Sequence, residues 1–401
     1  MTLNGPCVSL FPWYFDTEIT MAIDPSKLLS ENKRFFENDA TTLLKLGDRK
    51  EYLIQSASRI VRDCPPKLPW ASLFRGEVHR GFFVGPTAIA YFFWTLSVKH
   101  ADLEIEGRLP LDWCKAYIEL GQDAVPRLLD VSCGITNVFL TSNAVKACLY
   151  QDESRAMEVI NALRNLETDP TYCEWLKGRA GALYILRIIR QWLPSLATAV
   201  NEVITLLIEV ILPQQPWSWS DRKYIGSVHG NIGILTQIVL SDPSYAPKLE
   251  NKLLELLNLQ GEEGNWPVIE GKEIGLVQFC HGAPGVLISL LPIRQYFPAL
   301  HEQIDKAIEL GRKVTWERGI LTKEPNICHG ITGNALVLDG PQKEHFLCLA
   351  TPEKVEQGVA DGVFEKDADP FGLLWGEAGR AWVWMEVWDG SEGKLVLYSD
   401  V

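Results

Sequence analysis

Two kinds of apolar pattern alternate along the chain. Short, nearly continuous apolar runs, such as 182–190 and 286–291, predict helices that are buried on all sides, because they leave no polar face for solvent. Between them lie stretches with apolar residues at helical spacing and charged residues on the other face, as in 153–166 and 300–311. Alternating strand patterns are sparse. The chain is therefore predicted to be all-α, with an inner and an outer helix in each repeated unit.

Glycine turns mark the start of each buried run. A Gly-x-x-Gly element recurs at steps of roughly 50 residues, and such a period indicates a repeat architecture. Glycine at these places lets neighbouring backbones approach closely, and Pro284 suits the first turn of the helix that follows. Seven units result. Five complete copies begin at Gly178, Gly230, Gly282, Gly330 and Gly376, and two degenerate copies begin at Gly85 and Gly134.

Seven helix pairs can stack as an open superhelix or close into a ring. Continuously apolar inner helices favour the ring, because closure leaves them no side that faces solvent. We therefore predict a double-layered (α/α)7 toroid with all glycine turns around one end of the central cavity. Residues 1–75 are expected to form an irregular arm and a first outer helix over 45–62, and residues 76–401 the seven units. Because no Ser/Gly-rich linker interrupts the chain, one domain over 1–401 is expected.

Composition and charge narrow the functional classes. Of the 401 residues, 47% are hydrophobic and 22% are charged, which is typical of a folded globular protein. The net charge of −13 argues against nucleic-acid binding, which demands a basic face. The nine cysteines are scattered, which indicates a reducing compartment rather than a disulfide scaffold. Because the start lacks a basic segment and no apolar run approaches about 20 residues, a cytoplasmic protein without a membrane span is expected.

Two of the glycine turns carry the same scarce residues. Cys-His-Gly stands at 280–282 and again at 328–330, although the chain holds only 9 cysteines and 7 histidines. Zinc prefers thiolate and imidazole ligands, and a catalytic zinc keeps one of its four positions open. We therefore predict a metal site formed by Cys280, Cys328 and one or both of the histidines that follow them. Two alternatives stay open: a closed Cys2His2 structural site, and buried cysteines and histidines that bind no metal.

Several of the glycine turns carry longer motifs of one family. They are Lys-Gly-Arg-Ala-Gly at 177–181, Tyr-Ile-Gly-Ser-Val-His-Gly at 224–230, Val-Gln-Phe-Cys-His-Gly-Ala-Pro-Gly at 277–285, and Lys323 followed by Cys-His-Gly at 328–330. With these motifs, nearly the whole chain resembles the lanthionine synthetase C-like family, the eukaryotic relatives of the bacterial lantibiotic cyclases. The Cys-His-Gly-Ala-Pro-Gly form is similar to the eukaryotic branch.

The resemblance implies a zinc-dependent enzyme that forms thioethers. The family adds thiols to dehydroalanine or dehydrobutyrine, and its eukaryotic members use glutathione. Carried over by motif, Cys280, Cys328 and His329 would hold Zn²⁺ and leave the fourth position for the incoming thiol. His229 is the candidate for the proton transfer that follows, since imidazole titrates near neutrality, and packing of the glycine turn is the alternative. His281 would be a general acid or a group beside the ligands rather than a ligand.

Two cations match family positions that are associated with the carboxylates of glutathione. Arg34 and Lys323 would bind this anionic tripeptide, and the alternative for both is a solvated surface charge. The chain also departs from the family. Trp375 stands where relatives usually carry glutamate, Glu365 falls near the place of an arginine, and Lys177 replaces an aromatic residue. These departures concern the glutathione contacts rather than the metal ligands.

Three functions compete on these residues. The first is an enzyme that adds glutathione or another thiol to a dehydroamino-acid peptide, a protein or an electrophilic metabolite. The second is a sensor or scaffold that binds zinc and glutathione without turnover. The third, a glycosidase on a similar toroid, needs two catalytic carboxylates, but the glycine turns offer only Glu377. His229 favours the enzyme, because binding alone requires no proton donor.

Overall fold

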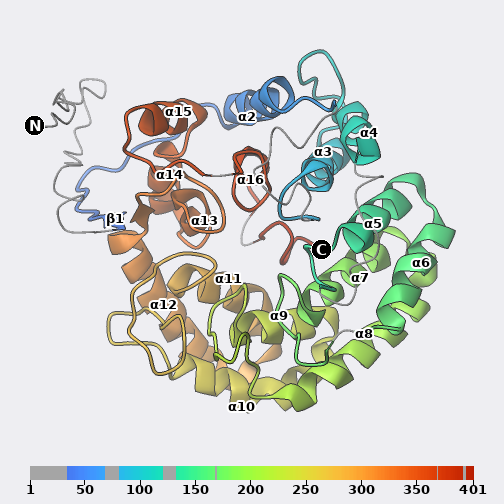
Figure 1. Cartoon of the computed structure of the whole chain (residues 1–401). Coiled ribbons are helices and arrows are strands. Elements are labelled where there is room, and N and C mark those ends of the chain that lie inside the picture. The colour runs from blue at the N-terminus through green and yellow to red at the C-terminus, as the bar shows by residue number, and fades with distance from the viewer. Residues whose placement is uncertain (1–33, 68–80, 121–131, 168, 368, 392–393) are drawn as a thin grey trace, which may run out of the picture.

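The computed structural model describes residues 34–67, 81–120, 132–167, 169–367, 369–391 and 394–401, which form a ring of two helical layers (Figure 1). The predicted α/α toroid is confirmed. The inner layer consists of α3 (Pro86–Lys99), α5 (Val138–Tyr150), α7 (Arg179–Trp192), α9 (Asn231–Ser241), α11 (Ala283–Ile293), α13 (Ile331–Ala335) and α16 (Glu377–Trp388). The outer layer consists of α2 (Arg49–Asp63), α4 (Pro110–Leu120), α6 (Glu153–Arg164), α8 (Ala197–Ile211), α10 (Ala246–Leu257), α12 (His301–Arg318), α14 (Gly340–Cys348) and α15 (Pro352–Ala360). Short 3-10 turns occupy Pro194–Leu196, Leu212–Gln214, Pro243–Tyr245, Arg294–Tyr296 and Pro298–Leu300.

The first outer helix closes the ring. α2 packs against α16, the last inner helix, and α16 also contacts α3, the first inner helix. The sequence predicted this outer helix from residue 45, but it begins at Arg49. Asp48 causes the later start, because its side chain accepts the backbone N–H of Lys50 at 2.9 Å and caps the helix. The part of the predicted arm before residue 34 lies outside the described residues.

Burial separates the two layers as the hydrophobic pattern predicts. In α11 almost every side chain is buried, and Pro284 stands at the start, where a helix does not need the missing N–H. The outer helix α6 instead buries a single stripe at helical spacing, made up of Ala156, Val159, Ile160 and Leu163.

The turns before the inner helices lie side by side at one end of the ring. The backbone N–H of Cys280 donates to the carbonyl oxygen of Cys328 at 3.1 Å, and the N–H of Cys328 donates to that of Leu374 at 2.9 Å. A similar bond of 3.2 Å runs from the N–H of Trp175 to the carbonyl oxygen of Val228. Corresponding turns of adjacent units therefore become neighbours in space.

The second unit departs from the predicted register. The sequence pattern assigns Gly134 to the first glycine position, but α5 begins after Asn137. The Asn137 side chain accepts the N–H of Leu140 at 2.9 Å and caps the helix, so no glycine is needed there. Gly134 instead lies against the next turn, where an added Cβ would be 2.6 Å from the carbonyl oxygen of Leu176.

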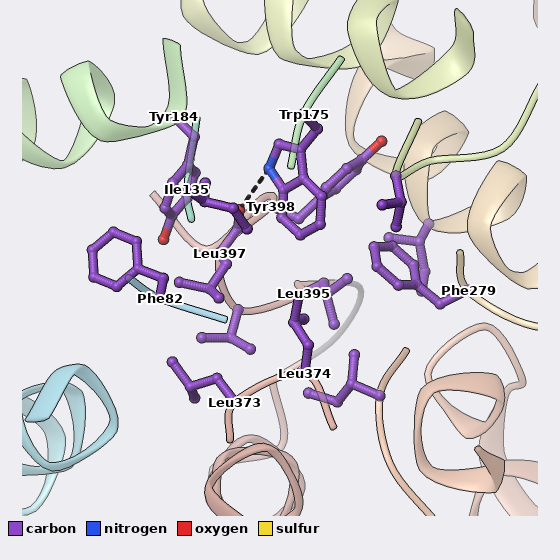
Figure 2. Packing of buried hydrophobic residues seen from close by; sticks show 14 of the residues in the cluster. Phe82, Ile135, Trp175, Tyr184, Phe279, Leu373, Leu374, Leu395, Leu397 and Tyr398 are labelled. Atoms are coloured by element: carbon purple, nitrogen blue, oxygen red, sulfur yellow. Dashed lines mark hydrogen bonds between the residues drawn. The ribbon is translucent and has the colours of Figure 1, made fainter. Parts of the chain in front are cut away.

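Apolar side chains fill the middle of the ring beside the turns (Figure 2). Leu395, Leu397 and Tyr398 of the C-terminal segment are fully buried there. The indole N–H of Trp175 donates to the carbonyl oxygen of Leu397 at 3.1 Å, and the rings of Trp175 and Phe279 stand edge-on to that of Tyr398. The centre of the ring, expected as a cavity, is thus packed at this point.

One outer helix is part of an apolar segment longer than the sequence analysis expected. With the 3-10 turns at its two ends, α8 belongs to a helical segment of 21 residues, Pro194–Gln214, with a mean hydropathy of 1.8. By length and composition alone this segment could span a membrane, contrary to the expectation. In the ring, 33% of its apolar window is buried, and α8 packs against α6 and α7.

Two short strands bring the start of the described chain to the sixth unit. β1 (Phe35–Phe36) pairs antiparallel with β2 (Ile320–Leu321). Beyond this pair, the N–H of Thr322 donates to the carbonyl oxygen of Arg34 at 3.1 Å. Arg34 thus lies beside the segment that leads into the sixth turn.

Replacing Gly285 by alanine is expected to destabilise the protein by about 3 kcal/mol. The added Cβ would lie 1.9 Å from the carbonyl oxygen of Phe279, so α11 would have to move away from the turn that carries Cys280. Gly275→Ala is the matched control, because nothing lies within 4 Å of its added Cβ. Thermal and urea unfolding of both variants tests this, and equal stability of the two would contradict the close contact.

Candidate metal centre

Two neighbouring turns bring three metal-binding side chains together. The Sγ atoms of Cys280 and Cys328 and a ring nitrogen of His329 all lie within 4.8 Å of one another. Both cysteines are buried, and the His329 side chain is 13% exposed. In the part of the chain that the structure describes, no other group of three Cys, His, Asp or Glu side chains is so placed. These are the three residues that the family resemblance assigns to zinc.

The donor set fits zinc. Two thiols and one imidazole at these mutual distances can point at a common centre, and zinc takes such ligands in a tetrahedron. Three protein ligands leave the fourth position open, as in catalytic zinc sites. His281 is not part of the cluster, so the described residues do not assemble the closed Cys2His2 alternative.

The charges around the cluster favour a cation. A hydrogen bond with Cys328 holds the pKa of the Cys280 thiol well below its usual range despite burial, and the same contact raises the pKa of Cys328. Burial lowers the pKa of His329, but bonds to Asp367 and Cys280 outweigh it and raise this pKa to about 9. Surroundings that favour a proton on His329 also favour a metal cation at the same point.

Two polar side chains hold His329 in place. Its Nε2 lies 3.4 Å from Oδ1 of Asp367, and because a carboxylate can only accept, the imidazole donates and Nδ1 is left for a metal. The backbone N–H of His329 donates to Oδ1 of Asn326 at 2.8 Å. Asn326 Nδ2 in turn donates to Oδ2 of Asp367 at 2.6 Å. The sequence carried no signal for Asp367, which lies outside the glycine-turn motifs.

An aromatic side chain covers one side of the cluster. The ring of Trp375 stands edge-on to His329 with centroids 5.4 Å apart, and Phe83 packs on Trp375 at 4.9 Å. Trp375 is one of the three residues that the sequence analysis singled out as departures from the family pattern. It places an uncharged ring beside His329, the candidate metal ligand.

A buried carboxylate holds His229 in the fourth turn. Nδ1 of His229 lies 3.0 Å from Oε2 of Glu174, whose side chain is 1% exposed. Because the carboxylate accepts this hydrogen bond, Nε2 is left to exchange a proton. The backbone N–H groups of Leu176 and Lys177 donate to Glu174 at 2.7 and 2.5 Å. Trp219 stacks on the imidazole with ring centroids 5.5 Å apart and planes 9° apart.

Sequence reasoning missed both Glu174 and Trp219. Glu174 belongs to the third turn, and the lateral contact between units brings it to His229 in the fourth. Its position just before the Lys177-Gly178 motif was the only available signal. Trp219 lies outside the motifs, in a tight hairpin closed by bonds of 2.9 and 3.1 Å between its backbone and that of Arg222.

The fourth turn lies directly against the fifth. A Cβ on Gly226 would be 2.3 Å from the carbonyl oxygen of Cys280. The Tyr224 ring lies 6.0 Å from the ring of His229 and 5.7 Å from that of His281. Burial lowers the pKa of His281, Cys280 opposes this, and His229 adds to it. Both predicted histidines therefore lie beside the cysteine turns, with His281 outside the ligand set.

The two predicted anion-binding residues are also brought together. Backbone pairing at Thr322 places Arg34 beside the segment that carries Lys323. Arg34 is exposed and the Lys323 side chain is 40% exposed. Lys323 Nζ lies 3.5 Å from Oε2 of Glu365, so this carboxylate offsets part of the positive charge. The expected contact for glutathione thus contains a carboxylate of its own.

The ring of helix pairs and its cluster of two cysteines and a histidine define an α/α toroid protein with a candidate metal centre among its glycine turns. The chain belongs to the lanthionine synthetase C-like family. The family model described as "Lanthionine synthetase C-like protein" matches residues 84–394.

Individual proteins show the same relationship. Glutathione S-transferase LANCL1 of Danio rerio is 26% identical over 291 residues, which cover 64% of this chain and 71% of that protein. LanC-like protein GCL1 of Arabidopsis thaliana is 28% identical over 176 residues, 40% of each chain. The structure of nisin cyclase superimposes with a TM-score of 0.57 at 15% identity and covers 88% of this chain and 98% of its own. This likeness shows a shared fold.

Proposed function

We propose that this protein is a zinc-dependent enzyme that adds a thiol, in the first instance glutathione, to a dehydroamino acid or a similar electron-poor alkene. One observation carries this function: a carboxylate-held imidazole, His229 on Glu174, lies in the turn next to the cluster of Cys280, Cys328 and His329. The name of the Danio rerio relative, a glutathione S-transferase, supports the same chemistry.

The cluster would activate the thiol, and His229 would transfer the proton. Zinc held by Cys280, Cys328 and His329 would lower the pKa of a thiol in the fourth position and supply a thiolate at neutral pH. The sulfur forms a bond to the β-carbon of the alkene, and the electron pair moves toward the α-carbon as an enolate. The proton that the thiol loses passes to Nε2 of His229, directly or through water, and the imidazole then gives this proton to the α-carbon, so that the addition is balanced. Glu174 keeps Nδ1 of His229 as a donor and so directs Nε2 to this transfer.

A non-catalytic protein that binds zinc and glutathione is the second candidate. The cluster of Cys280, Cys328 and His329 would be sufficient for such binding. It gives no role, however, to an imidazole that a fully buried carboxylate orients beside the cluster. Turnover of an alkene substrate separates the two functions.

We also propose a cytoplasmic location. The described cysteines are all free, as expected in a reducing compartment, where glutathione is available. Fractionation of cells that produce the tagged chain tests this, and recovery from a secreted or membrane fraction would contradict it.

The direct test combines metal content with product formation. The purified chain is analysed for zinc and incubated with glutathione and a peptide that contains dehydroalanine or dehydrobutyrine, and the adduct is followed by mass. About one zinc per chain together with an adduct is expected. Zinc without an adduct, across several thiols, would favour the binding protein. No zinc would contradict the metal centre.

Replacing Glu365 by glutamine is expected to lower the KM for glutathione up to about fivefold, the range of an exposed ion pair. The substitution frees Lys323 from its carboxylate partner without changing the size of the side chain. The kcat should stay unchanged, because neither residue belongs to the metal cluster. Glu270→Gln, which breaks the exposed pair with Lys223, is the matched control. An unchanged KM would show that Lys323 does not contribute to the binding of glutathione.

A further inference from the structure

A buried charge network continues from Asp367, the partner of His329, toward the outer layer of the ring. The backbone N–H of Asp367 donates to Oε2 of Glu324 at 3.0 Å. The other oxygen of Glu324 accepts from Nη2 of Arg380 at 3.0 Å, and the same nitrogen donates to Glu377 at 2.8 Å. Glu377 also lies 3.3 Å from Nη1 of Arg59 on α2.

A buried ion network of this kind is weak evidence for a role in stability alone. The side chains of Glu324, Glu377 and Arg380 are 3%, 1% and 1% exposed, and burying such charges costs more than their attraction usually returns. Apolar residues of similar volume would serve stability alone at least as well. With Asp367, the network holds three carboxylates against the guanidinium groups of Arg380 and Arg59, and Arg59 also lies 3.7 Å from the exposed Asp63, so the excess charge is negative.

We infer, on the basis of the proposed zinc centre, that Glu324 and Arg380 are positioning residues for the metal ligand His329. Glu324 divides its two oxygens: one binds Arg380 and the other fixes the backbone of Asp367. Asp367 thereby presents its carboxylate to Nε2 of His329, which leaves Nδ1 as the nitrogen available to a metal.

Arg380 holds the second support of His329 as well. Its Nη1 donates to the carbonyl oxygen of Pro325 at 2.5 Å, which fixes the segment that contains Asn326. Asn326 accepts the backbone N–H of His329 and donates to Asp367. One guanidinium on α16 thus controls both groups that orient the imidazole. The excess negative charge of the network makes His329 a stronger donor to a dication.

Metal affinity and ligand geometry test this role independently of turnover. Zinc affinity is measured by competition with a chromophoric chelator, and Co²⁺ absorption reports the ligand geometry. Asp367→Asn is expected to weaken zinc binding 10- to 100-fold, the usual effect of losing a partner of a metal-bound histidine. Glu324→Gln, which keeps the shape of the side chain, is expected to weaken it about 10-fold and to change the Co²⁺ spectrum.

A double-mutant cycle shows whether Glu324 acts through Asp367. In the Asp367→Asn background, Glu324→Gln is expected to have little further effect, because coupled residues are not additive. Asp305→Asn, which removes a carboxylate from the exposed pair with Arg294, is the matched control and should leave affinity unchanged. Arg380→Met should weaken zinc binding to the same extent as Glu324→Gln. A cooperative thermal unfolding transition shows that this variant is folded.

The outcomes separate this role from the proposed function. Unchanged zinc affinity and Co²⁺ spectrum in Glu324→Gln, or additive effects in the cycle, would overturn the positioning role while the zinc enzyme stands. A lower unfolding temperature without a change in affinity would show a purely structural network and overturn it equally. Failure of the wild-type chain to bind zinc or cobalt would overturn the zinc centre and the positioning role together.

Discussion

Replacing Cys328 by alanine is expected to abolish metal binding and thioether formation together. Cys328 is one of three side chains whose ligand atoms lie within 4.8 Å of one another, so its loss leaves only a thiol and an imidazole. Zinc affinity should fall by more than 100-fold, beyond the effect of losing a partner outside the ligand set. Zinc content after dialysis and the mass of the glutathione adduct are the two measurements.

Cys348→Ala supplies the matched control for this change. Cys348 is a half-buried cysteine on the outer helix α14 and lies outside the cluster, so zinc and adduct should both stay at the wild-type level. Stoichiometric zinc in the Cys328→Ala variant would show that the cluster is not the metal site. Loss of adduct with zinc retained would assign Cys328 a role other than ligation.

Replacing His229 by alanine is expected to lower the rate of adduct formation by a factor of about 10² to 10⁴ while zinc stays bound. His229 is not a ligand, but it lies in the turn next to Cys280 and is held by Glu174 at 3.0 Å. Without the imidazole, the α-carbon must take its proton from solvent. Initial rates at saturating glutathione, together with zinc content, measure the effect.

Two companion variants define how His229 works. Glu174→Gln removes the charge that holds Nδ1 and should reduce kcat more than KM, because orientation of the imidazole matters after the substrates have bound. His301→Ala is the control, since this histidine lies on the outer helix α12 and contacts the carbonyl oxygen of Arg294. Full activity in His229→Ala would assign the proton transfer to another group, with His281 of the adjacent turn as the next candidate.

The candidate metal ligands agree with the family motifs more closely than the expected glutathione contacts do. The three candidate ligands lie in the motifs that carry the family resemblance, whereas Lys323 is paired with Glu365 and Trp375 stands beside His329. The network of Glu324 and Arg380 adds a further local arrangement behind the same ligand. Specificity for the thiol and the alkene should therefore be sought in the side chains around the candidate ligands rather than in the ligands themselves.

The repeat and the helical layers were readable from the sequence because they depend on local chemistry. A continuously apolar helix has to be buried on all sides, and a glycine before it permits close approach of the next turn. Those two facts led to the ring and to the pairing of Cys280 with Cys328, since equal places in adjacent units become neighbours. The same local reasoning failed at Gly134, because Asn137 can cap α5 with its own side chain.

Contacts between distant segments required the tertiary structure. Glu174 meets His229, Asp367 meets His329 and Arg380 meets Glu324 across different turns and helices, and no periodic pattern marks these partners. The exclusion of His281 from the ligand cluster was likewise decided by the tertiary structure. Spacing along the chain thus determined which turns meet, and three-dimensional packing decided which charges face one another, because an ion pair depends on distances in space and leaves no period in the sequence.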